Sequence, residues 1–333
     1  MNKLALYIFY TILIFFTIAC AGEPKPSENS SAMNGKSETF TIPDFNADSA
    51  LYFVKRQVEF GPRVPNTESH KACGDWLIKK LSSYSDTVYV QGARVRAFEG
   101  TTLNIRNIIG SFNPERRNRI LLCAHWDTRP FADADPDPQF HYTPIDGAND
   151  GASGVGVLLE IARLLKLQKP GIGVDIMLFD AEDYGKHEEF AGQADDSWAL
   201  GAQYWAGNPH VSNYFANYGI LLDMVGAKNA TFRHERYSMH FAPDIVRKVW
   251  NTAHRLGYSS VFINEPGGYI VDDHYYINTI ARIPTINIIH YDPSQRHGFF
   301  EQWHTMGDNM DIIDKETLRA VGETVVTVIY EER

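Results

Sequence analysis

The stretch Ile120-Leu121-Leu122-Cys123-Ala124-His125-Trp126-Asp127 begins with five apolar residues and then turns polar within two positions. Short, continuously apolar runs of this kind are typical of strands that are buried on both faces of a sheet. Three more runs have the same character, at residues 174–179, 220–224 and 285–289. The sequence therefore predicts a central sheet that is covered on both sides.

Other patterns surround these runs. Apolar residues recur at helical spacing over residues 50–58, 67–81, 152–167, 243–256 and 316–330, several of them after a Ser, Thr or Asp that can cap a helix. Residues 87–95 and 103–109 alternate as half-buried strands do. Strands interspersed with helices in this way predict an α/β fold: a three-layer α/β/α sandwich around a mostly parallel mixed sheet.

Length and charge narrow the range of functions. The chain has 333 residues, of which 44% are hydrophobic, so a core of ordinary size is available. The formal net charge of −10 disfavours a nucleic-acid partner, because such binding depends on Lys and Arg. Without a repeat or a second break in composition, residues 41–333 are expected to form a single catalytic domain, and we expect a monomer.

The N-terminus has the layout of a secretory signal, with Lys3 followed by an unbroken apolar run from Leu4 to Ala19. Its end, Thr17-Ile18-Ala19-Cys20, resembles the lipobox of bacterial lipoproteins. We expect residues 1–19 to be a signal peptide and Cys20 to carry a lipid anchor, which would hold the protein at the periplasmic side of the cell envelope and would be its only membrane contact. An ordinary secretory signal with an incidental cysteine is the alternative. Residues 20–40 are polar and predict a flexible tether.

The two remaining cysteines could form a disulfide in an oxidising compartment. Cys73, however, falls in a helical pattern and Cys123 in an apolar strand, which favours two buried free thiols.

Polar side chains follow the ends of the buried strands. They are His125, Asp127, Asp180, Glu182, Asp183, Asp223 and His290. Because the carboxyl ends of parallel strands meet at one edge of a sheet, these side chains are expected to converge there. Clustered carboxylates and imidazoles favour a bound cation, and zinc accepts both donor types while leaving one position open in catalytic sites.

Six segments resemble the zinc aminopeptidase and glutaminyl cyclase superfamily, and the resemblance runs from about Phe60 to the C-terminus. The segments are Ala124-His125-Trp126-Asp127, Gly147-Ala148-Asn149-Asp150, Leu178-Phe179-Asp180-Ala181-Glu182-Asp183, Leu222-Asp223-Met224-Val225-Gly226, Asp272-Asp273-His274 and Trp303-His304-Thr305-Met306-Gly307-Asp308-Asn309.

The resemblance implies roles for individual residues. Asp150, Asp183 and His304 would bind zinc, and Glu182 would be the general acid and base. It also implies that Asp223 and Asp273 form a hydrogen-bonded acidic network beside the metal, and that Trp303 forms part of the substrate pocket. The cyclases of animals and the aminopeptidases have Glu where Asp183 stands, but the shorter carboxylate reaches zinc at the same bond length if the backbone lies closer.

The two branches of the superfamily differ in metal count. Aminopeptidases bind a second zinc with the residues that match His125 and Asp223, whereas cyclases keep those residue types and bind one ion. The Trp303-His304 pair and the Asp272-Asp273-His274 triplet resemble the cyclases. We therefore expect one zinc ion and an acyl-transferring enzyme that converts the N-terminal Gln of peptides and proteins to pyroglutamate with release of ammonia. A two-zinc aminopeptidase and a noncatalytic envelope binding protein are the alternatives.

The segment from Tyr184 to Leu200 is long and polar and has Gly185 and Gly201 near its ends. It could be a surface insertion without a catalytic task. Alternatively, it folds over the pocket and contributes Trp198, since a small substrate needs apolar walls that exclude water.

Overall fold

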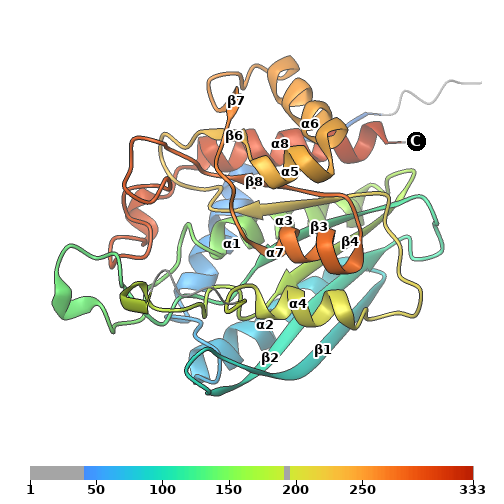
Figure 1. The fold of residues 1–333 in the computed structure, drawn as a ribbon. Helices are drawn as coiled ribbons and strands as arrows, with labels where there is room; N and C mark the ends of the chain where they lie inside the picture. Colours follow the sequence, from blue (N-terminus) through green and yellow to red (C-terminus); the bar gives the residue numbers. More distant parts are fainter. Residues whose placement is uncertain (1–40, 191–195, 333) are drawn as a thin grey trace, which may run out of the picture. The chain divides into compact units, whose positions relative to one another are not determined.

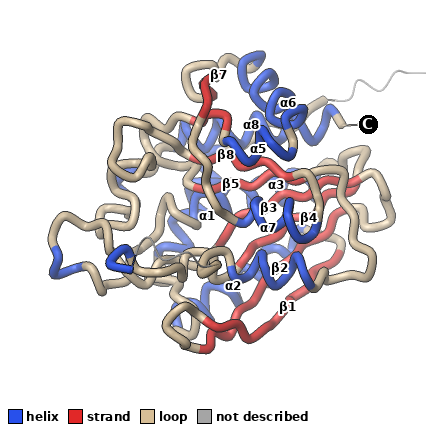
Figure 2. Tube along the Cα trace, viewed as in Figure 1, coloured by secondary structure: helices blue, strands red, loops and turns tan. Residues whose placement is uncertain are grey.

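A computed structural model describes residues 41–190 and 196–332 of the chain, and Ile42–Arg333 forms one compact unit. Its main sheet has six strands in the order β1-β2-β4-β3-β5-β8 (Figure 2). Their bounds are β1 Thr87–Arg96, β2 Thr102–Phe112, β3 Arg119–His125, β4 Gly173–Phe179, β5 Gly219–Asp223 and β8 Thr285–Ile289. β2 is antiparallel to both β1 and β4, while β3 is parallel to β4 and β5, and β5 is parallel to β8. The predicted mostly parallel mixed sheet is confirmed.

Successive side chains of each strand point to opposite faces of the sheet, so the strands contribute to two separate cores. In β3, Leu122 and Ala124 pack into the larger core, and Leu121 and Cys123 pack into the smaller one. The larger core contains residues of α1 (Ala47–Val58), α2 (Glu68–Tyr84), α3 (Ala152–Leu167), α6 (Pro243–Arg255) and α8 (Lys315–Glu331).

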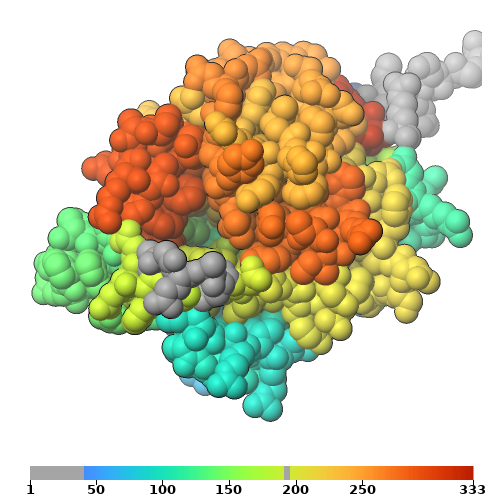
Figure 3. Space-filling model, viewed as in Figure 1, coloured from blue at the N-terminus to red at the C-terminus, as the bar shows by residue number. Residues whose placement is uncertain are grey.

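The smaller core is covered by α4 (Leu200–Gly207) and α7 (Asp273–Tyr276), which lie side by side on the other face of the sheet (Figure 1). In the space-filling view, their segments form neighbouring yellow and orange parts of the surface (Figure 3). Helices therefore cover both faces of the sheet, and the three-layer α/β/α sandwich is confirmed.

Local sequence signals explain where the long helices begin. The side chain of Asn46 accepts a hydrogen bond from the Ser49 N–H at the start of α1, and the Thr67 side chain accepts one from the His70 N–H at the start of α2. α3 begins instead at Gly151, whose φ of 94° is unfavourable for other residues. A Cβ at Gly151 would lie 2.8 Å from the Asp127 carbonyl oxygen, so only glycine lets the helix begin directly behind Asp150.

Several short elements had no counterpart among the predicted segments. They are α5 (Arg236–Phe241) and the parallel pair β6 (Phe232–His234) and β7 (Phe262–Pro266). None is long enough to display an apolar period, so tertiary contacts rather than local pattern determine them.

Cys73 and Cys123 are both buried and free, as predicted. The predicted signal peptide, the tether and Cys20 lie outside the described residues. Within the described ranges, no helix has the length and apolar character needed to cross a membrane.

Candidate functional site

Asp150, Asp183 and His304 come together from three loops at the carboxyl ends of the central strands. One donor atom of each lies within 4.8 Å of the others. His304 Nε2 is 3.7 Å from Asp150 Oδ2 and 3.2 Å from Asp183 Oδ1. Asp183 Oδ2 is buried and accepts no hydrogen bond from any described residue, although buried acceptors are nearly always satisfied. Two carboxylates and an imidazole at this spacing fit a zinc ion.

The pKa shifts of Asp150, Asp183 and His304 also favour a bound cation. Burial raises the pKa of Asp150, and the nearby Asp183 charge raises it further. Burial raises the pKa of Asp183 to about 8, although Arg129 and His125 oppose the shift. Burial and the Arg129 charge lower the pKa of His304 to about 4, which keeps its imidazole neutral and able to bind a metal.

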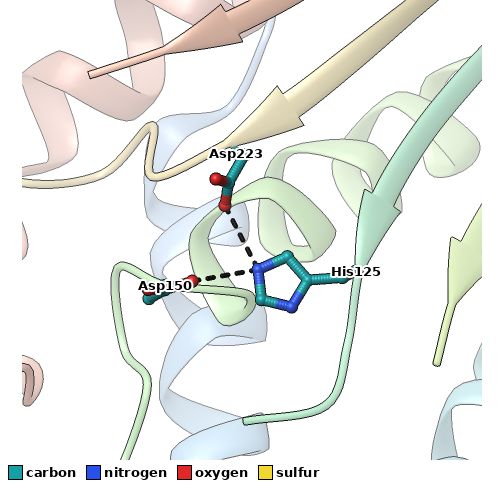
Figure 4. A group of neighbouring side chains, drawn as sticks. All are labelled: His125, Asp150 and Asp223. Atoms are coloured by element: carbon teal, nitrogen blue, oxygen red, sulfur yellow. Dashed lines mark hydrogen bonds and ion pairs between the residues drawn. The ribbon is translucent and has the colours of Figure 1, made fainter. Parts of the chain in front are cut away.

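A second donor group adjoins the first and shares Asp150 with it (Figure 4). His125 Nε2, at the end of β3, lies 3.0 Å from Asp150 Oδ1 and 3.2 Å from Asp223 Oδ1, at the end of β5. Burial opposes a charge on His125, but Asp127, Asp150 and Asp223 together raise its pKa well above the usual value. Either a protonated His125 or a second cation can therefore hold this group together.

Two further carboxylates fix the backbone around the ligands. Asp127 accepts hydrogen bonds from the N–H groups of Glu182 and Asp183, at 3.0 and 3.1 Å. Asp308 accepts them from Asn149 and Asp150, at 2.7 and 3.0 Å. The sequence marked Asp308 only as part of a matching segment, because nothing in its local pattern shows which backbone it will bind.

Three positions at the site have a strained backbone. Ala181, Met224 and His304 all have positive φ, at 53°, 51° and 53°. Each is a site residue or directly adjoins one, and non-glycine residues in this region are uncommon and often occur at functional sites.

Arg129 connects the ligands to the pocket wall, and sequence reasoning missed it. Its guanidinium is 1% exposed and binds both carboxylate oxygens of Asp133, and Asp133 Oδ1 lies 3.4 Å from His304 Nδ1. It also donates to the carbonyl oxygens of Asp183, Gly185 and Lys186. Its Cζ lies 4.7 Å from the centre of the Trp198 ring. A carboxylate on the second nitrogen of a metal-binding imidazole orients the ring and selects its tautomer.

These groups open into a cavity of about 430 Å³. The Trp303 ring stacks on His304 with centroids 3.5 Å apart, and the Trp198 ring stacks on the same imidazole at 6.0 Å. Both indoles line the cavity, so the structure places Trp198, near the C-terminal end of the Tyr184–Leu200 segment, in the pocket wall. The remaining lining is a mixture of acidic, aliphatic and aromatic residues that includes Asp223, Asp272, Tyr269, Ile270, Val271 and Phe299.

Glu182 lines the same cavity and is 9% exposed. Burial raises the pKa of its carboxyl group well above the usual value, and the charges of Asp272, Asp183 and Asp273 add to the shift while His125 opposes it. A carboxyl group whose pKa approaches the working pH can both accept and return a proton.

The hydrogen bond expected between Asp223 and Asp273 is not formed. Asp223 Oδ1 faces His125 Nε2 instead, and neither carboxylate oxygen of Asp273 accepts a hydrogen bond within the described part of the chain. The physical reason is that His125 Nε2 offers Asp223 Oδ1 a donor, so Asp223 is satisfied without Asp273. Asp272, the neighbour of Asp273, lines the cavity.

Two other strand-end residues turn away from the cavity. Asp180 pairs with His70 Nε2 at 2.9 Å and accepts the Arg106 N–H. His290 stacks on Phe300 instead. The positive φ of Ala181 reverses the chain after Asp180, which explains why Asp180 and Glu182 face different surroundings.

Comparisons with known proteins agree with this geometry. The model of peptidase family M28 matches residues 107–329. A glutaminyl cyclase from Bacteroides thetaiotaomicron, solved with N-acetylhistamine bound, is 56% identical over 88% of this chain and 100% of its own, with a TM-score of 0.86. A Zn-dependent exopeptidase from Parabacteroides distasonis is 57% identical over the same shares, also with a TM-score of 0.86.

A more distant relative is the glutaminyl-peptide cyclotransferase of Boiga dendrophila, which is 26% identical over an alignment of 287 residues that covers 77% of this chain and 70% of the relative. The family model covers most of the sheet and all of the proposed ligands. The chain therefore belongs to peptidase family M28.

Proposed function

We propose that this chain is a zinc-dependent glutaminyl-peptide cyclotransferase, which converts the N-terminal Gln of peptides and proteins to pyroglutamate and releases ammonia. The observation that carries the proposal is the placement of Glu182 beside the Asp150, Asp183 and His304 donors, in a cavity lined by two indole rings. The 56% identity to a bacterial glutaminyl cyclase over nearly all of the described chain supports the choice of reaction.

We propose that a single zinc ion is held by Asp150, Asp183 and His304. When bound there, zinc supplies Lewis acidity toward the side-chain amide carbonyl of the substrate. Arg129 and Asp133 hold the His304 imidazole, with Nε2 facing the two carboxylates.

Protein side chains transfer the proton during the reaction and stabilise the leaving group. The α-amino nitrogen of the substrate attacks its own side-chain amide carbon, so that the ring N–C bond forms and the bond to the amide nitrogen breaks. Glu182 accepts a proton from the attacking nitrogen and returns it to the departing one, which leaves as ammonia. Asp273 is fully buried next to Asp272, which lines the cavity, and both of its carboxylate oxygens are free of partners in the described chain. We propose that one of them accepts a hydrogen bond from the leaving amide group.

The two indoles favour cyclisation over hydrolysis. Water that reached the amide carbon would convert Gln to Glu instead of closing the ring. Trp198 and Trp303 both stack on the His304 imidazole and line the cavity, which reduces the room for such a water.

The proposal is tested by incubating the zinc-loaded protein with a Gln-initiated peptide and a matched Leu-initiated peptide. The expected result is one ammonia per Gln peptide, a product that keeps all its residues, and no change in the Leu peptide. Release of a free N-terminal residue from either peptide would contradict the proposal.

A zinc aminopeptidase is the second candidate, because His125, Asp150 and Asp223 form a second donor group and because one solved relative is described as a Zn-dependent exopeptidase. Metal analysis separates the two. About one zinc per chain agrees with the cyclase, and about two with the aminopeptidase.

We also propose that the mature protein is a lipoprotein of the cell envelope, attached through Cys20 and facing the periplasm. The support is the sequence alone: an apolar run that ends at Cys20 and a polar segment that follows it. Mass spectrometry of the mature N-terminus should find an acylated Cys20, and an unmodified N-terminus elsewhere would refute the anchor.

A further inference from the structure

Asp273 is held in place without any hydrogen bond to its own carboxylate. Both carboxylate oxygens are buried and have no partner among the described residues. The residue begins α7, a helix of only four residues that leads into a single π turn at Ile277–Ala281. The backbone of this short element must therefore fix the direction of the carboxylate.

The residue that follows Asp273 is anchored by a buried acid from another segment. His274 Nε2 lies 3.0 Å from Glu235 Oε2, and Glu235 is 1% exposed. The same carboxylate accepts the N–H groups of Tyr237 and Ser238, at 2.8 and 2.6 Å, and thereby caps α5. It also accepts the N–H of Ile270, at 3.2 Å, and Ile270 lines the cavity.

The residue that precedes Asp273 is anchored through the same acid. Glu235 Oε2 accepts the Ser238 hydroxyl at 2.7 Å, and the Ser238 oxygen accepts the N–H of Asn287 in β8 at 2.9 Å. The Asn287 side chain donates to Asp272 Oδ2 at 2.6 Å, and Asp272 Oδ1 accepts the N–H of Asp273. These hydrogen bonds and the backbone of residues 272–274 therefore close a ring that holds the backbone of Asp273.

We propose that Glu235 is a positioning residue, which sets the orientation of Asp273 and of the cavity wall at residues 268–272. The inference rests on the proposed cyclase function, in which Asp273 faces the leaving amide. A carboxylate with five donors from three segments is held rigidly, and small displacements of a group near the reacting atoms can cost about a hundredfold in rate. An acid that only capped α5 would need neither His274 nor Ile270.

The test is a double-mutant cycle between Glu235→Gln and Asp273→Asn, with zinc content measured for each variant. Glu235→Gln is nearly isosteric, and we expect kcat to fall about tenfold to a hundredfold while KM changes little. In the Asp273→Asn background, Glu235→Gln should lower kcat by less than about threefold, because Glu235 acts on the reaction by orienting Asp273. Equal losses in both backgrounds would overturn the proposal.

His274→Leu provides a second route if Glu235→Gln folds poorly. It removes the donor that links Glu235 to α7, while Glu235 still accepts the N–H groups of Tyr237 and Ser238. A kcat loss similar to that of Glu235→Gln is expected, and a native kcat in His274→Leu would overturn the proposal. Asp175→Asn is the matched control, because Asp175 is an equally buried acid with Ser111, Arg119 and Tyr214 as partners. It should lower stability without changing kcat.

Hydrogen exchange gives a readout that does not depend on activity. Glu235→Gln should speed amide exchange in residues 268–276 as well as in α5, whereas Asp175→Asn should not. Faster exchange confined to α5 would show that Glu235 acts only as a helix cap, and would refute the inference. This result can be obtained even if the activity of Asp273→Asn is too low to measure. If the native protein does not cyclise Gln peptides while the exchange result holds, the proposed function fails and the structural link stands.

Discussion

Replacing Arg129 with Leu tests how the metal ligands are held. The substitution removes a guanidinium that is 1% exposed and leaves the Asp133 carboxylate buried without its partner. Burial opposes the charge on Asp133, but hydrogen bonds from Arg129 and His304 hold its pKa well below the usual range, so the group is ionised in the native protein.

The expected cost has two parts. Stranding one member of a buried ion pair costs about 3–5 kcal/mol of unfolding free energy. For a domain of this size, that corresponds to a melting temperature lower by roughly 10 °C. In addition, Asp133 would no longer be fixed against His304 Nδ1, and loss of such an outer partner weakens metal binding by about tenfold to a hundredfold.

Arg119→Leu is the matched control. Arg119 lies at the other end of β3, is 11% exposed, and binds both oxygens of the buried Asp175. Thermal unfolding of the chelator-treated proteins and zinc titration should show a stability loss in both variants but weaker zinc binding only in Arg129→Leu. Native zinc affinity in Arg129→Leu, or an equal loss of affinity in Arg119→Leu, would refute the reasoning.

Three further predictions concern histidines. His304→Ala should lose zinc and activity together, because it removes one of three donors, and full zinc occupancy by metal analysis would exclude His304 as a ligand. His125→Ala should keep one zinc per chain while lowering stability, and a fall from two ions to one would favour the aminopeptidase. Burial lowers the pKa of His290 to about 4, against about 6.5 in the unfolded chain, so the unfolded state binds more protons between these values. The contribution of His290 to the free energy of unfolding should therefore be largest above about pH 6.5 and fall by roughly 3 kcal/mol toward pH 4. Urea unfolding of His290→Phe should lack this component of the pH dependence, and a pH profile identical to that of the native protein would contradict the prediction.

The sequence predicted the long, regular elements well because burial leaves a strong pattern there. The apolar run at residues 120–124 lies in β3, and the helical period at residues 152–167 coincides with α3. Short elements such as α5 and α7 carry too few residues for a period, and their contacts are with distant segments.

The sequence predicted which residues form the candidate site but not where each side chain points. Strand ends and matching segments pointed to Asp150, Asp183 and His304, and the structure brings these three together. The pattern could not tell that Asp180 turns toward His70, because the positive φ of Ala181 is a tertiary feature. Arg129 and Glu235 were missed for a related reason, since the contacts that tie them to the site, with the Asp183 carbonyl and with His274, span 54 and 39 residues.

The central claim is that Glu182 moves the proton during cyclisation. The most direct measurement compares the native enzyme with Glu182→Gln, at equal and verified zinc content, on a Gln-initiated peptide, with ammonia and the peptide product both quantified. Since Gln cannot accept the proton of the amine, we expect zinc and substrate binding to persist while turnover falls about a hundredfold to ten-thousandfold. A Glu182→Gln enzyme that kept its zinc and formed pyroglutamate at near the native rate would contradict the account.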